Sequence, residues 1–77
     1  MYTIEMSTAF HEIVPPKNFG VVLIDNDDYL TIKVETDELL ALETQDEREA
    51  AVKYINDVKK ALEGLGATVL VVREAAN

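Results

Sequence analysis

Apolar and polar residues alternate over residues 2–8 (YTIEMST) at the start of the chain. This alternation predicts a half-buried β-strand, because successive side chains of a strand point to opposite faces. Residues 10–14 fit two interpretations: they continue the strand, or they form one helical turn capped by Ser7. Pro15 and Pro16 end the element in either case, since proline lacks the backbone N–H that regular structure needs.

Two further apolar segments flank the acidic stretch at residues 25–28 (DNDD). Residues 19–24 (FGVVLI) predict a strand that is apolar on both faces. Residues 29–35 (YLTIKVE) alternate between apolar and polar positions, as a half-buried strand does. The short polar side chains between the two segments favour a turn, because they hydrogen-bond to nearby backbone groups. The pattern predicts a β-hairpin with residues 25–28 as its loop.

A helix is predicted to begin at Gln45. Thr44 and Glu47 match the S/T-x-x-E capping box, in which the two side chains bind backbone N–H groups of the first turn. Apolar residues then recur at steps of four and three, which is typical of one face of an amphipathic helix. They are Ala51, Ile55, Val58, Leu62 and Leu65. Gly64 or Gly66 provides the left-handed residue that ends such a helix.

Residues 67–72 (ATVLVV) predict a final, buried strand. A strand, a helix and a buried strand in succession indicate a crossover that makes the two strands parallel. The expected fold is therefore α+β, in one domain spanning residues 1–77. It has a mixed three- or four-stranded sheet (a hairpin, then a helix crossover to a buried strand) with one main helix packed on one face. The conformations of residues 9–18 and 36–43 stay open, and residues 73–77 are expected to fray.

The predicted strands at residues 21–24 and 69–72 are apolar on both faces, whereas one helix covers only one face of a sheet. The second face therefore needs a cover, because large exposed apolar patches are rare on monomers. Residues 10–19 could fold over it. Otherwise a second copy of the chain or another protein must cover it, and we expect a homodimer as readily as a self-covered monomer.

Composition excludes several classes of protein. A chain of 77 residues is too short for two domains, and without cysteine it forms no disulfide and offers no thiolate to a metal or substrate. No apolar run approaches the roughly 18 residues that span a bilayer, and the first residues lack the pattern of a signal peptide. These features lead us to expect a cytoplasmic protein that does not bind membranes.

The net charge of -8 is confined to one third of the sequence. Ten acidic and two basic residues lie between Asp25 and Glu49, which accounts for the whole imbalance, and the remaining five acids and five bases cancel. Such a surface repels nucleic acid, so we expect no direct nucleic-acid binding. We expect a partner with a basic surface instead.

The predicted turn and the predicted helix start account for six acids of this segment, because both favour acidic side chains. The rest indicate either a surface that keeps the protein soluble or a docking site for a basic protein, including one that normally binds nucleic acid. The predicted partner-binding residues are Asp25, Asp27, Asp28, Glu35, Asp37, Glu38 and Glu43. The strand at residues 29–35 should hold them in two clusters roughly 20 Å apart.

No motif supports catalysis, a cofactor or a bound metal. The EF-hand pattern started at Asp25 needs a glycine and a glutamate where Leu30 and Thr36 stand. His11 meets Ser7 only if its segment is helical, and nothing completes a triad. We therefore predict a non-enzymatic acidic protein-interaction module, such as an inhibitor or adaptor that engages a basic protein through residues 25–49. The alternative is a homodimeric regulatory or small-ligand-binding domain with its site between subunits.

Overall fold

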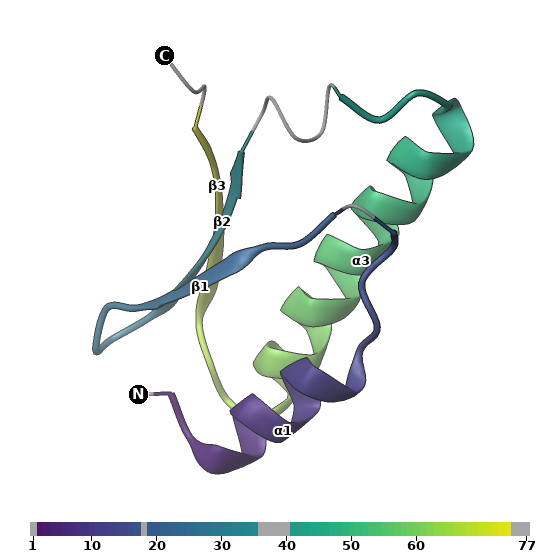
Figure 1. The fold of residues 1–77 in the computed structure, drawn as a ribbon. Coiled ribbons are helices and arrows are strands. Elements are labelled where there is room, and N and C mark those ends of the chain that lie inside the picture. The colour runs from purple at the N-terminus through teal and green to yellow at the C-terminus, as the bar shows by residue number, and fades with distance from the viewer. Residues whose placement is uncertain (1, 18, 36–40, 75–77) are drawn as a thin grey trace.

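The computed structural model describes residues 2–17, 19–35 and 41–74. Its elements are α1 (Ile4–Glu12), β1 (Val22–Asp25), β2 (Leu30–Glu35), α3 (Gln45–Gly64) and β3 (Val69–Glu74). The strands form one three-stranded sheet in the order β1-β2-β3, with β1 antiparallel and β3 parallel to β2 (Figure 1). The predicted α+β fold, with a hairpin followed by a helix crossover, is confirmed.

The N-terminal segment is a helix, so the strand predicted for residues 2–8 is wrong. Thr3 caps α1, and its Oγ1 accepts a hydrogen bond of 3.1 Å from the backbone N–H of Met6. Met6 is buried, and Phe10 and Ile13 pack against the same core. Their spacing of four and three is that of one helix face, whereas Ile4, a member of the apparent alternation, is exposed.

The hairpin forms as predicted, but its loop lies one residue later and its first strand begins at Val22, so residues 19–21 of the predicted strand are not part of it. Asp25 pairs with Leu30, so the four-residue loop comprises residues 26–29. The backbone N–H of Asn26 donates to the carbonyl of Tyr29 at 3.0 Å and closes it. Asp27 has a φ of 67°, in the left-handed region that short polar side chains tolerate better than most.

The core lies between the sheet and the helices. In β2, Leu30, Ile32 and Val34 are 0% exposed and point towards the helices. The capping box at Thr44 is present, and four members of the predicted apolar stripe of α3 are buried: Ala51, Ile55, Val58 and Leu62. Leu65 is 45% exposed, contrary to prediction, because α3 ends at Gly64.

The chain turns from α3 into β3 at Gly66, whose φ of 96° confirms the expected left-handed residue. In contrast to the expectation of a buried strand, β3 lies at the edge of the sheet, and only Val69 among its first four residues is buried. Arg73 belongs to β3 and is not frayed. Of the two segments left open, residues 9–12 belong to α1 and residues 13–17 form neither helix nor strand. In the second, residues 41–43 include the buried Leu42, and residues 36–40, like residue 18, lie outside the described part of the chain.

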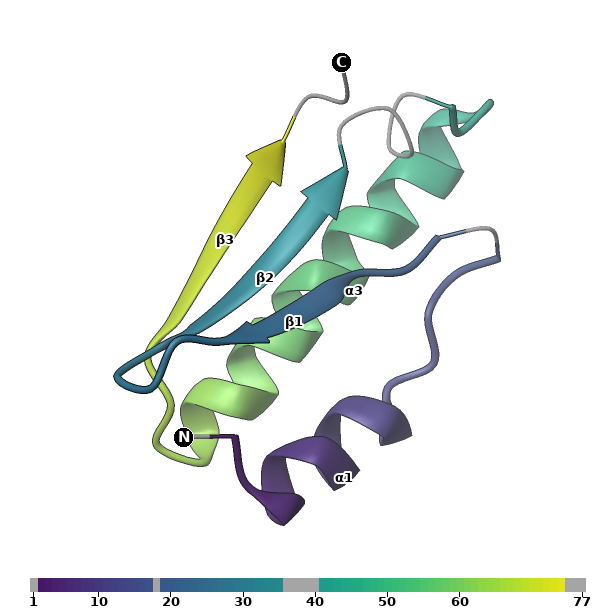
Figure 2. The ribbon, with the colours of Figure 1, turned by 60° about the vertical axis from the view of Figure 1, so that its left-hand side comes forward.

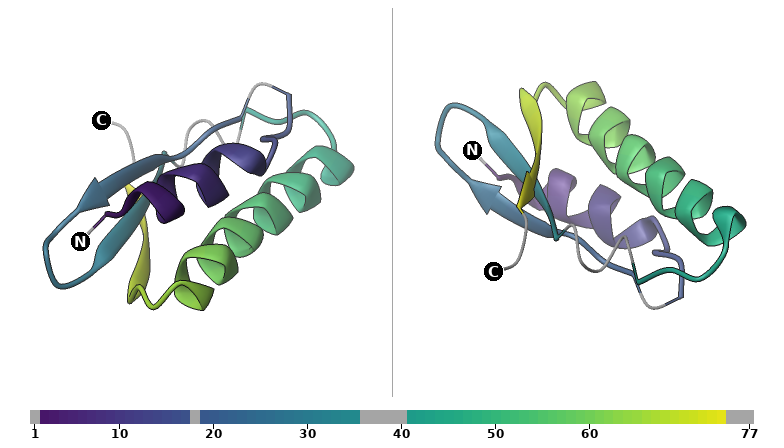
Figure 3. Two further views of the ribbon diagram at one scale, coloured as in Figure 1. Left: turned by 90° about the horizontal axis from the view of Figure 1, so that it is seen from below. Right: turned by 90° about the horizontal axis from the view of Figure 1, so that it is seen from above.

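Both helices lie on one side of the sheet, and the other side carries no element of the described chain (Figures 2 and 3). Residues 10–19 do not cover this second face, because Phe10, Ile13 and Phe19 pack into the core on the helix side. The rings of Phe19 and Tyr54 pack edge to face, with their centroids 6.3 Å apart. No helix within the described ranges is long and apolar enough to cross a bilayer.

Candidate functional site

The side of the sheet away from the helices, here called the outer face, is largely aliphatic. Two of its cross-strand rows are Val22, Lys33 and Val72, and Ile24, Thr31 and Leu70, and the register puts the pair Glu35 and Glu74 in the next row. The exposed fractions of the four aliphatic residues are 59% for Val22, 39% for Ile24, 50% for Leu70 and 39% for Val72. Neighbouring strands lie about 4.8 Å apart, so the two pairs on β1 and β3 flank Thr31 and Lys33 of β2 across a face about 10 Å wide.

Such a surface departs from the usual pattern of a sheet with one solvated face, where outward positions are polar. The polar residues present are in the central strand. Thr31 is 8% exposed, and its Oγ1 accepts a hydrogen bond of 2.8 Å from the side-chain amide of Asn26. Lys33 is half-buried between the two outer strands. The aliphatic residues therefore dominate both flanks of the outer face.

The free edge of β3 adjoins this face. The backbone N–H of Leu30 donates to the carbonyl of Thr68 at 2.8 Å, which fixes the phase of the parallel ladder. In that phase Leu70 and Val72 direct their backbone polar groups to β2, whereas Val69, Val71 and Arg73 direct theirs away from the sheet. No strand among the described residues pairs with β3 on that side.

Val71 adds an apolar side chain to this edge. It pairs with Ile32 in the register of β2 and β3, so it faces the helix side of the sheet. Ile32 is fully buried there, yet Val71 is 39% exposed. The helices therefore cover the centre of the sheet and leave the inner side of β3 partly open.

The acidic residues of the hairpin loop lie at one end of the sheet. Asp25 is used within the fold: its two carboxylate oxygens accept hydrogen bonds of 3.0 Å from the backbone N–H groups of Tyr2 and Asp27. Hydrogen bonds to this carboxylate, these two backbone bonds among them, lower the pKa of Asp25 to about 2. Asp27 and Asp28 are exposed in the loop.

The remaining predicted partner-binding residues lie elsewhere. Glu43 is exposed just before α3, and Glu35 ends β2. Asp37 and Glu38 lie outside the described residues. A helix of 20 residues is about 30 Å long, and α3 runs from the Glu43 end of the molecule back towards the hairpin loop (Figure 1). The structure thus places Asp25, Asp27 and Asp28 at the opposite end from Glu43.

Ser7 and His11 meet because their segment is helical, but the geometry does not suit nucleophilic catalysis. Nδ1 of His11 lies 2.7 Å from the Ser7 carbonyl oxygen and 3.4 Å from Ser7 Oγ. A nitrogen that donates to a carbonyl carries its proton, so it does not accept one from the hydroxyl. Within the described ranges, no group of three or more potential ligands could hold a metal ion.

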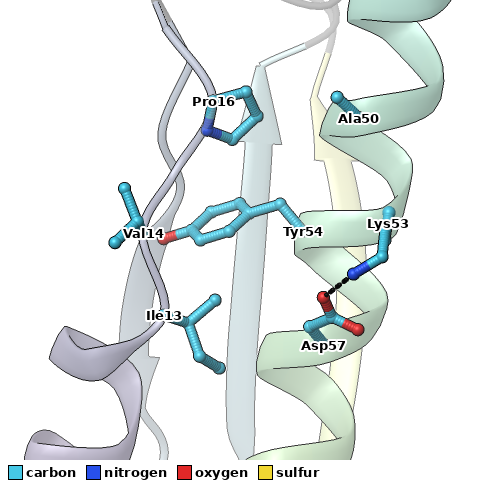
Figure 4. Close-up of a pocket in the computed structure, with 7 residues that line it drawn as sticks. All are labelled: Ile13, Val14, Pro16, Ala50, Lys53, Tyr54 and Asp57. Carbon is cyan, nitrogen blue, oxygen red and sulfur yellow. Dashed lines mark hydrogen bonds and ion pairs between the residues drawn. The ribbon is translucent and has the colours of Figure 1, made fainter.

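A depression of about 240 Å³ lies between α3 and the segment after α1 (Figure 4). The Tyr54 ring reaches across it towards Ile13, Val14 and Pro16. Its only charged lining residues, Lys53 and Asp57, pair with one another at 2.8 Å. Burial raises the pKa of Tyr54. The depression is smaller than the roughly 300 Å³ at which ligand pockets begin, so it is a weaker candidate than the outer face.

The chain matches no protein-family model, no curated protein and no solved structure among those compared. The candidate site therefore rests on geometry alone. It consists of the outer face and the β3 edge, with the aliphatic residues Val22, Ile24, Leu70, Val71 and Val72. The sequence contained their signal in two strands apolar on both faces, but the position of β3 at the edge was not predicted.

Proposed function

We propose that this chain is a non-enzymatic protein-interaction module that binds another protein chain through its outer face. The observation that carries the proposal is a set of exposed aliphatic side chains on β1 and β3, on either side of Thr31 and Lys33 in β2, which no element of the described chain covers. Burying such side chains is favourable, at about 25 cal/mol per Å² of apolar area removed from water. A protein surface is the natural cover, because it can supply an apolar area of matching width.

Charge selects the partner in this proposal. The exposed Asp27 and Asp28 lie at one end of the molecule, and the exposed Glu43 and Asp46 lie at the other. A partner with an apolar centre and basic groups at its rim would match both features, and a nucleic-acid-binding protein has such basic groups. Rim charges act mainly on the association rate, so binding should slow as salt is added.

Photo-cross-linking in cells of the source organism tests the proposal. A benzophenone-bearing amino acid is placed at Val22 or Leu70 on the outer face. Matched control positions are Asn56 and Glu63, which are exposed on α3. The expected result is a discrete adduct from Val22 and from Leu70 that is absent from both helix positions.

Two outcomes would contradict the proposal. If the helix positions give the same adducts as the outer-face positions, the contact is not made by the sheet. If neither Val22 nor Leu70 gives an adduct, the outer face is not an interaction surface in the cell. The role of charge in partner binding is tested separately, by measuring how fast the identified partner associates with the double variant D27N/D28N. If this variant associates as fast as the wild type at low salt, Asp27 and Asp28 do not attract the partner.

A further inference from the structure

The β3 edge has few of the features that normally protect an exposed strand. Edge strands of monomers are usually short, or carry proline, a bulge or charged residues that prevent pairing with another chain. The first four residues of β3, Val69–Val72, are all aliphatic, and its six residues pair with β2 in an uninterrupted register. By contrast, β1 at the other edge has four residues and ends in Asp25.

We propose that two copies of this chain pair antiparallel along β3, with a two-fold axis at Val71, to form one continuous six-stranded sheet. Directly opposed residues of an antiparallel pair lie on the same face, so outer residues must oppose outer residues. A two-fold axis through a residue satisfies this condition. An axis between two residues would place Leu70 on one copy opposite an inner-face residue of the other.

Backbone hydrogen bonding selects Val71 among the allowed centres. The groups that point away from β2 belong to Val69, Val71 and Arg73. With the axis at Val71, the two Val71 residues exchange both hydrogen bonds, and Val69 of each copy does so with Arg73 of the other. An axis at Leu70 or Val72 leaves one of these three residues without an opposed partner inside β3.

Side chains agree with the same register. Leu70 of one copy opposes Val72 of the other on the outer face, and the two Val71 side chains meet on the inner face. The partial exposure of Val71, which the helices of its own copy leave open, is then covered by the second copy. The residues of β3 that oppose one another in this register, residues 69–73, include no acid, and Glu74 at the end of the strand opposes Thr68 of the other copy.

Packing two outer faces directly against each other is a weaker arrangement. One face is three strands wide, roughly 10 Å by 15 Å between backbone axes, and face-to-face packing adds no backbone hydrogen bond between the copies. It would also leave the β3 edge and Val71 uncovered. Edge pairing widens the outer face to six strands, roughly 25 Å across. The second copy therefore completes the surface on which the proposed function rests.

Cysteine cross-linking tests the register, because the chain has no cysteine of its own. In the proposed dimer the Cα atoms of the two Val71 residues lie about 5.5 Å apart, within the range that a disulfide spans. V71C should therefore oxidise to a covalent dimer. L70C and V72C are the matched controls, since each lies two residues out of register with its own counterpart. They should form disulfides at least about tenfold more slowly alone, but should cross-link readily when mixed.

Sedimentation equilibrium of the wild-type chain, from micromolar to millimolar concentration, measures the dimer itself. V71P removes only a backbone N–H that points away from β2, so the fold persists while the dimer dissociates. A wild-type chain that stays monomeric throughout would overturn the inference, and so would L70C cross-linking alone as fast as V71C. If the chain is monomeric but the outer face still forms adducts with a different protein, the dimer is refuted while the proposed function stands.

Discussion

Both faces of the sheet carry aliphatic residues, but the exposure of these residues differs between the centre of the inner face and the outer face. On the inner face, Leu30, Ile32 and Val34 are fully buried beneath the two helices. On the outer face, Val22 and Leu70 keep half or more of their surface in water. A hydrophobic pattern thus shows which faces of a strand favour burial, whereas the number of helices decides which of them the chain itself can cover.

This difference separates folding from association. Side chains on the inner face lose their water when the chain folds, so their transfer free energy stabilises the monomer. Those on the outer face keep much of their water in the folded monomer and would lose it only on binding to a second surface. Exchanges of the same chemical type on the two faces should therefore affect different measurements, namely the free energy of unfolding on the inner face and binding on the outer face.

The largest expected effect compares an isoleucine on the inner face with one on the outer face, at neighbouring positions of the β1–β2 register. Ile32→Ala, in the centre of the inner face, should lower the free energy of unfolding by about 2–5 kcal/mol, because it leaves a cavity among close-packed neighbours. Ile24→Ala on the outer face is the matched control and should cost about 1 kcal/mol or less. Urea unfolding of both variants at low protein concentration makes the measurement. Equal losses would show that the faces do not differ in this way.

The helix α3 and the strand β2 were predictable, because the local sequence pattern and the tertiary packing favour the same structure there. The capping box at Thr44, the alternation of β2 and the stripe of α3 as far as Leu62 each indicate one structure, and each is confirmed. The alternation of residues 2–8 misled because it is short, and because Met6, Phe10 and Ile13 fit a helix equally well. Packing against α3 decided between the two, and a local pattern contains no information about that packing.

The candidate site was predictable only in part. Two strands apolar on both faces indicated that a second face needed a cover, and the uncovered outer face agrees with this argument. The acidic cluster at residues 25–28 indicated a docking site, yet Asp25 is bound within the fold. The edge position of β3 depends on strand order, which is set by the whole sheet and not by the sequence of any strand.

A smaller effect concerns the turn that brings β3 to the edge. Gly66→Ala should cost roughly 1–2 kcal/mol, since its φ of 96° lies where a Cβ is strained. Gly64→Ala, the matched control, ends α3 in open space and should be neutral or stabilise the protein by up to about 1 kcal/mol. Thermal unfolding of the two variants measures their stabilities. If both lose stability equally, backbone conformation at Gly66 is not the cause.

Asp25, at the end of β1, should make the free energy of unfolding depend on pH. The pKa of Asp25 is lowered from its ordinary 3.8 to about 2, so its ionised form stabilises the folded state. That contribution is complete above the unfolded pKa and disappears as pH falls through about 2. The stability advantage of the wild type over D25N should therefore shrink between about pH 4 and pH 2. Urea unfolding of both proteins across this pH range measures the difference in their free energies of unfolding. A difference that does not change with pH would contradict the prediction.

The smallest expected effect gives the sharpest test of the outer face. Val22→Thr keeps the β-branched shape and adds a hydroxyl at a residue that is 59% exposed. In the monomer that hydroxyl meets water, so the free energy of unfolding should change by no more than about 0.5 kcal/mol. Val34→Thr, the same exchange on the inner face, places the hydroxyl among apolar neighbours and should cost about 1–3 kcal/mol. A loss of that size for Val22→Thr at low concentration would mean that the outer face is already covered in the isolated chain, which would leave no free surface for a partner.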